Sequence, residues 1–146
     1  MIAGDGPDVP LLDEFVVTRL DLELDGAGGI WRVFVQDFLA ALPGRTEQLR
    51  QALTSGDARG AMVVVQGLRT SSQMVGAERL AGVALELEQL LRELARGTDA
   101  AGVLPQLAAD QLPRIKRAAV QTEALLTSHL HSGRYRQRPR QVTGNP

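Results

Sequence analysis

The sequence predicts an all-α fold, an antiparallel up-down four-helix bundle with a short additional N-terminal helix. Apolar residues recur at helical spacing over long stretches, and these stretches are separated by glycine-containing segments typical of turns. Aromatic residues make up only 3% of the 146 residues, so leucine, valine and alanine supply most apolar side chains. This composition favours helices over strands, which are enriched in β-branched and aromatic residues.

The predicted elements follow the chain in order. Residues 1–9 are polar and predict a flexible leader, and residues 10–131 predict the bundle. Pro10 suits the first position of a helix, Pro43 predicts a kink, and Asp57 is a good N-cap residue. The expected helices span residues 10–24, 30–53, 58–75, 77–96 and 102–131; Pro113 makes the last either one kinked helix or two. Residues 132–146 are polar and rich in arginine, which predicts a basic disordered tail.

Composition and charge argue against several classes of function. The formal net charge of −1 is too small for a chain that binds nucleic acid over its whole surface. The chain has no cysteine, which excludes disulfides and thiolate metal sites and fits a cytoplasmic location. No apolar stretch approaches the roughly 20 residues of a membrane span, and the N-terminus lacks the pattern of a signal peptide. We find no glycine-rich phosphate loop and no metal-ligand spacing, so we expect no cofactor, no metal and no small-molecule substrate.

Residues 65–77 read Val-Gln-Gly-Leu-Arg-Thr-Ser-Ser-Gln-Met-Val-Gly-Ala. This segment resembles the signature of the histidine-containing phosphotransfer (HPt) domain family: a small residue, His, any residue, Leu, Lys, small residues, and then an apolar-Gly-Ala step. Leu68 matches the Leu, Arg69 matches the Lys, and Val75-Gly76-Ala77 matches the step into the next helix. The resemblance covers about residues 11–96 and implies a bacterial two-component or phosphorelay context.

Gln66 stands where this family has its phosphate-accepting histidine. Imidazole titrates near neutrality, with a reference pKa of about 6.5, and offers an unprotonated nitrogen as nucleophile. The amide nitrogen of glutamine has a delocalised lone pair, so phosphoryl transfer to Gln66 is chemically unreasonable. We therefore expect a degenerate member of the family that is not an enzyme and has no catalytic residue. It is expected to bind a response-regulator receiver domain or a sensor kinase, as an adaptor or competitor.

One helix face carries the residues expected to contact the partner. Gln66, Arg69, Thr70 and Gln73 have the spacing i, i+3, i+4 and i+7, which places them on the same side of a helix. In the family this face meets the acidic pocket of a receiver, and a guanidinium at Arg69 suits carboxylates. The expected contact residues are Met62, Val63, Gln66, Arg69, Thr70 and Gln73.

Two other functions remain open from the sequence. The first is an active phosphotransfer protein that uses His129 or His131, the only histidines of the chain. The second is a helical dimerisation or scaffold module unrelated to signalling; either a monomer or a weak dimer is expected. The arginine-rich segment 134–140 is either an arm for nucleic acid, an acidic partner or a membrane surface, or only a solubilising tail.

Overall fold

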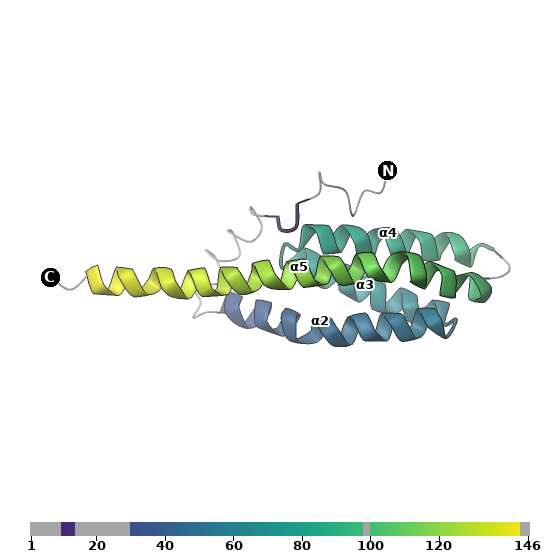
Figure 1. Ribbon diagram of the computed structural model, residues 1–146, viewed down its shortest axis with the longest axis horizontal. Helices are drawn as coiled ribbons and strands as arrows, with labels where there is room; N and C mark the ends of the chain where they lie inside the picture. The colour runs from purple at the N-terminus through teal and green to yellow at the C-terminus, as the bar shows by residue number, and fades with distance from the viewer. Residues whose placement is uncertain (1–9, 14–29, 98–99, 144–146) are drawn as a thin grey trace.

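The computed structural model describes residues 10–13, 30–97 and 100–143, with side chains described for 10–13, 32–97 and 102–131. In these residues the helices are α2 (Ile30–Thr54), α3 (Ala58–Met74), α4 (Glu78–Ala95) and α5 (Ala100–Thr143). They lie side by side and run alternately up and down, joined by short turns (Figure 1). The described residues contain no strand, so the predicted all-α bundle is confirmed.

The segment Pro10–Asp13 does not begin the helix that the sequence predicts there. Its backbone instead bonds to the junction between α3 and α4. The Asp13 amide donates to the Gly76 carbonyl at 2.6 Å, and the Leu11 carbonyl accepts from the Arg79 amide at 3.3 Å. These bonds replace the i to i−4 ladder of a helix, while Leu12 is buried. The rest of the predicted helix 10–24 and the leader 1–9 lie outside the described residues.

The turns on either side of α3 have clear local causes. The Asp57 carboxylate accepts from the Gly60 amide at 2.9 Å, so the predicted N-cap is confirmed. Gly56 and Gly76 have φ values of 80° and 78°, a conformation that side-chain-bearing residues rarely adopt. Gly76 therefore ends α3 in the manner the sequence predicts.

The helices that contain proline are continuous. α2 passes through Pro43, and the Thr46 hydroxyl donates to the carbonyls of Leu42 and Pro43 at 3.2 and 2.9 Å. Of the two alternatives for the last segment, α5 is a single helix through Pro113. It continues to Thr143 and projects beyond the bundle (Figure 1), into the segment for which the sequence predicts a disordered tail. Arginine and glutamine are good helix formers, and extending an existing helix avoids the cost of nucleation.

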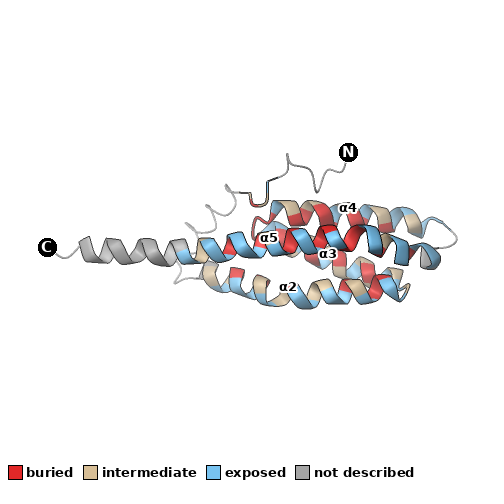
Figure 2. Ribbon diagram, viewed as in Figure 1, coloured by how far each residue is buried: buried red, intermediate tan, exposed pale blue. Residues whose placement is uncertain are grey.

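The core is almost entirely aliphatic and runs along the centre of the bundle, where the inward faces of the helices are buried (Figure 2). Each fully buried Leu or Val side chain contributes about 1.5–3 kcal/mol through removal from water. Arg114 of α5 is paired with Glu86 of α4 at the edge of this core. The fully buried residues include Leu49, Leu53, Val65, Leu68, Leu80, Leu87, Leu104, Ile115 and Leu126. None of the described helices combines the length and the apolar character needed to cross a membrane.

Two hydroxyls in the core lack a hydrogen-bond partner among the described residues, those of Ser72 and Thr122. Since an unsatisfied buried hydroxyl costs about 1–3 kcal/mol, Thr122→Val is expected to raise the free energy of unfolding by about 1 kcal/mol. Urea unfolding followed by circular dichroism measures this change. Thr127→Val, at an exposed position of the same helix, serves as the control and should change stability little. A destabilised Thr122→Val variant would contradict the assignment.

Candidate functional site

Gln66 lies on α3 and is half-buried, with its side chain directed toward α4. Its Nε2 donates to Oε2 of Glu88 at 3.5 Å, a long hydrogen bond. Glu88 is completely buried, although it is an acidic residue. The centre of the predicted contact face is therefore anchored to a buried carboxylate on the neighbouring helix.

Two arginines complete the surroundings of this carboxylate. Nε of Arg69 donates to Glu88 Oε1 at 2.6 Å, and Nη2 of Arg92 donates to Oε2 at 2.5 Å. Arg69 also donates through Nη1 to Oε1 of Gln73 at 3.4 Å. We call Gln66, Arg69, Glu88 and Arg92 the Glu88 cluster. Its two cations and one anion leave a net charge of +1, and the Arg92 side chain is 55% exposed.

Two opposing effects act on the pKa of Glu88. Burial raises it, because a charged carboxylate loses its hydration. The hydrogen bond and charge of Arg69, the charge of Arg92 and the hydrogen bond from Gln66 together outweigh burial, so the pKa of Glu88 lies below its usual value. Glu88 is therefore ionised at neutral pH, and its donors supply the compensation that a buried charge requires.

Next to this cluster, a stripe of small and apolar residues along α3 faces solvent. We call Val63, Gly67, Thr70 and Met74 the α3 stripe; their spacing of i, i+4, i+7 and i+11 keeps them in one line. Val63 is 66% exposed and Met74 is 50% exposed. A Cβ at Gly67 would meet no atom within 4 Å, so packing inside the chain does not require glycine there. The surface above Gly67 is open to close approach by another molecule.

A groove of about 210 Å³ lies between α2 and α3 at the Met74 end of the stripe. Two phenylalanines, a methionine and a valine form its apolar part, and one acidic and one basic residue border it. The lining residues are Phe34, Asp37, Phe38, Arg45, Ser71, Met74 and Val75. The α3 stripe and this groove together give a continuous surface with an apolar end.

The structure divides the predicted contact residues into two groups. Val63, Thr70 and Gln73 are exposed, as expected for a contact face. Met62, Gln66 and Arg69 are only partly exposed, and Met62 packs against the core.

Sequence reasoning missed Glu88, Arg92 and Met74. A signal for Glu88 was present, because it shares the spacing of the apolar stripe Ala84, Leu87 and Leu91 on α4. An acidic residue on a buried stripe indicates a specific partner. The residues that pair with Glu88 could not be predicted from the sequence of either helix alone.

The two histidines lie away from this face. His129 is half-buried and His131 is exposed, and both flank Leu130 near the start of α2. The Leu130 carbonyl accepts from Nη1 of Arg32 at 3.0 Å, which fixes this part of α5 against α2. Gln66 instead bonds to α4, so the structure does not bring either histidine to the position where the motif has its acceptor.

Comparisons with known proteins agree with this geometry. The family model described as Hpt domain matches residues 33–142. The crystal structure of histidine-containing phosphotransfer protein B (HptB) from Pseudomonas aeruginosa PAO1 is similar, with a TM-score of 0.68 and 23% sequence identity over 82% of this chain and 94% of that chain. At this identity the likeness concerns the fold. No curated protein matches the sequence.

The lowered pKa of Glu88 predicts acid sensitivity. Because the pKa is lower in the folded state, the ionised carboxylate adds stability above its unfolded value of about 4.3, and this stability is lost as pH falls through the folded pKa. Glu88→Gln should cost about 1–2 kcal/mol at pH 7, since both arginines keep contact with water, and should flatten the pH dependence below about pH 5. Urea unfolding between pH 3 and 7 measures both effects. The exposed Glu93→Gln is the control; an equally flat profile for both variants would contradict the prediction.

Proposed function

The chain belongs to the Hpt domain family, and from this premise we propose that it binds a response-regulator receiver domain or a sensor kinase without carrying phosphate itself. Gln66 carries the proposal, because it occupies the position of the acceptor histidine and its amide is bound to Glu88. The chain then acts in cytoplasmic phosphorelay signalling as an adaptor, or as a competitor of phosphate-carrying relatives.

Chemistry at the face supports the absence of phosphate transfer. A phosphate acceptor needs a free lone pair that attacks phosphorus and a group that is unprotonated near neutral pH. An amide nitrogen provides neither a free lone pair nor a titration in this range. Thr70 and Ser71 carry hydroxyls on α3, but a hydroxyl becomes a nucleophile only beside a general base. The side chain nearest to Gln66 that accepts protons is Glu88, which is held ionised by two arginines.

The exposed surface supports binding. Gly67 and Thr70 present little bulk at the middle of the α3 stripe, and Val63 and Met74 offer apolar contacts at its ends. The groove beside Met74 suits an apolar side chain from a partner helix. The Glu88 cluster adds a net positive charge at the edge of the stripe, which complements the acidic pocket of a receiver.

A small surface of this kind supports transient binding, since interfaces under about 1,200 Å² are typically weak. The Glu88 cluster is already ordered in the unbound chain, so its side chains lose little further entropy on binding. We therefore expect dissociation constants in the micromolar range, about −8 kcal/mol. Such a complex forms and dissolves readily, as a competitor of phosphate carriers requires.

A panel of receiver domains from the same organism tests the binding proposal by titration calorimetry. At least one receiver is expected to bind at micromolar strength, and Val63→Asp should weaken it about tenfold or more by placing a charge on the α3 stripe. Val63 is exposed, so the variant should fold normally. Val103→Asp, at an exposed apolar position of α5, is the matched control. The proposal fails if no receiver or kinase of the organism binds.

Phosphate transfer is tested separately with a phosphorylated receiver from that panel. The wild-type chain is expected to take up no acid-labile phosphate, whereas Gln66→His should become labelled, because an imidazole then occupies the acceptor position. Phosphate-affinity electrophoresis before and after acid treatment distinguishes phosphohistidine from phosphate esters. Labelling of the wild type, lost in the double variant His129→Ala/His131→Ala, would replace this proposal with an active phosphotransfer protein.

A further inference from the structure

A second groove, of about 240 Å³, lies between α2 and α5. In the bundle α2 contacts α3 and α5, and α4 contacts the same two helices. The α2–α5 groove is therefore on the side opposite to the α3–α4 pair that holds the Glu88 cluster, and it shares no lining residue with the α2–α3 groove. Its lining residues are Leu42, Pro43, Thr46, Lys116, Ala119, Val120 and Glu123.

An exposed apolar residue at the rim of this groove is flanked by opposite charges. Val120 is 64% exposed. Lys116 lies four residues before it and Glu123 three residues after it, so all three share one face of α5. Within the described part of the chain, neither Lys116 nor Glu123 forms an ion pair, and the charge of Lys116 reaches Glu47 of α2 only as a longer-range attraction. A lone exposed valine needs no explanation, but a valine between two opposite charges that form no ion pair gives a pattern that can match itself.

This pattern is complementary to a second copy of the same surface. If a two-fold axis passes beside Val120, the two α5 helices run antiparallel, and Lys116 of each copy faces Glu123 of the other. Each Val120 then lies against the groove of the opposite copy. A parallel arrangement would instead place like charges opposite each other, which is unfavourable.

The length of α5 fits the same arrangement. The helix spans Ala100–Thr143, so Val120 lies near its middle. Antiparallel pairing about Val120 therefore overlaps the two α5 helices along most of their length. The end of α5 that projects beyond its own bundle (Figure 1) then lies beside the first turns of the other α5.

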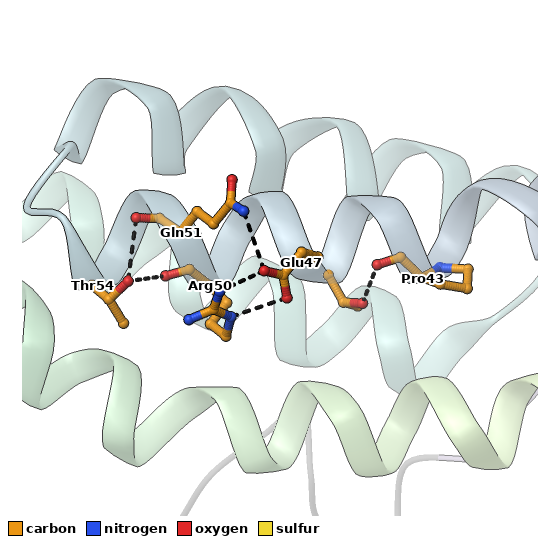
Figure 3. A network of polar contacts seen from close by, with 6 residues as sticks. Pro43, Glu47, Arg50, Gln51 and Thr54 are labelled. Carbon is orange, nitrogen blue, oxygen red and sulfur yellow. Dashed lines mark hydrogen bonds and ion pairs between the residues drawn. The ribbon is translucent and has the colours of Figure 1, made fainter.

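On the α2 side, the groove is followed by a polar surface. Its side chains form hydrogen bonds with other residues of α2. Arg50 bonds to both carboxylate oxygens of Glu47, Gln51 also donates to Glu47, and the Thr54 hydroxyl donates to backbone carbonyls (Figure 3). This network lies next to Pro43 along α2. It gives the apolar groove a polar rim, which is the usual anatomy of a protein interface.

We propose that the chain forms a weak antiparallel homodimer through the α2–α5 groove, with the two-fold axis beside Val120, between Ala119 and Val120. The dimer leaves the α3 stripe and the Glu88 cluster of both copies accessible. It uses none of the residues that line the α2–α3 groove, so dimer formation and receiver binding involve different residues.

A thiol at the axis tests the geometry directly. The chain has no cysteine, so Val120→Cys introduces the only thiol. Residues beside a two-fold axis of packed helices come within the Cα separation of about 5.5–6 Å that a disulfide needs. Mild oxidation is expected to give a covalent dimer on non-reducing electrophoresis. Val63→Cys is the matched control, since Val63 is 66% exposed against 64% for Val120 but lies on α3. Equal cross-linking of both variants, or none of Val120→Cys, overturns the proposal.

Charge exchange tests the pairing. Sedimentation equilibrium of the full chain should show a concentration-dependent dimer. Lys116→Glu should weaken it at least about tenfold, because two carboxylates then face each other. Lys116→Glu combined with Glu123→Lys should restore it. Both residues are exposed, and circular dichroism verifies that the variants fold. A monomeric wild type at all concentrations, or a double variant that stays as weak as the single one, refutes the antiparallel dimer.

Discussion

The burial of Glu88 between α3 and α4 is the constraint on which the candidate site depends. A carboxylate taken out of water needs charged and hydrogen-bonding partners, and here Arg69, Arg92 and Gln66 supply them. Since these donors come from both helices, the cluster fixes how α3 lies along α4 at this level. It also decides where the side chains of the motif point, and it leaves one positive charge in excess at the edge of the face.

In this arrangement the charge and the shape of the contact face come from different residues. Arg69 is directed to Glu88 through Nε, so its charge is shared with the interior and is not a free cation at the surface. The α3 stripe carries no charge and forms the exposed contact surface. At Gly67 an added Cβ would meet no atom within 4 Å, so a partner can approach the helix closely there. In the complex proposed above, an acidic partner meets a pre-ordered electrostatic edge beside an uncharged contact surface, which lowers the entropy lost on association.

The helices of the bundle were predictable because their signals are local. The apolar stripes, the Asp57 cap and Gly76 place the ends of α3 and α4 within one or two residues of the observed ones. The failures share a different cause. Pro10–Asp13 is held by backbone bonds to Gly76 and Arg79, far along the chain, and the Glu88 cluster depends on the register of two helices. The bonds of Pro10–Asp13 have no periodic trace in the sequence, and the spacing of Glu88 indicates a buried partner without identifying it. The shared helix face of Gln66 and Arg69 was therefore predictable, whereas their contacts with Glu88 were not.

The burial of the Glu88 carboxylate also gives a structural role to the glutamine at position 66. The Glu88 carboxylate accepts from Arg69 and Arg92, and its Oε2 also receives the amide of Gln66. A glutamine at this position adds a neutral donor without changing the charge of the cluster, whereas an apolar side chain would remove one partner of a buried anion. A polar residue at position 66 therefore has a structural role that does not require phosphate chemistry. The α3 stripe is the feature that this packing does not explain, because the apolar side chains of Val63 and Met74 stay exposed there.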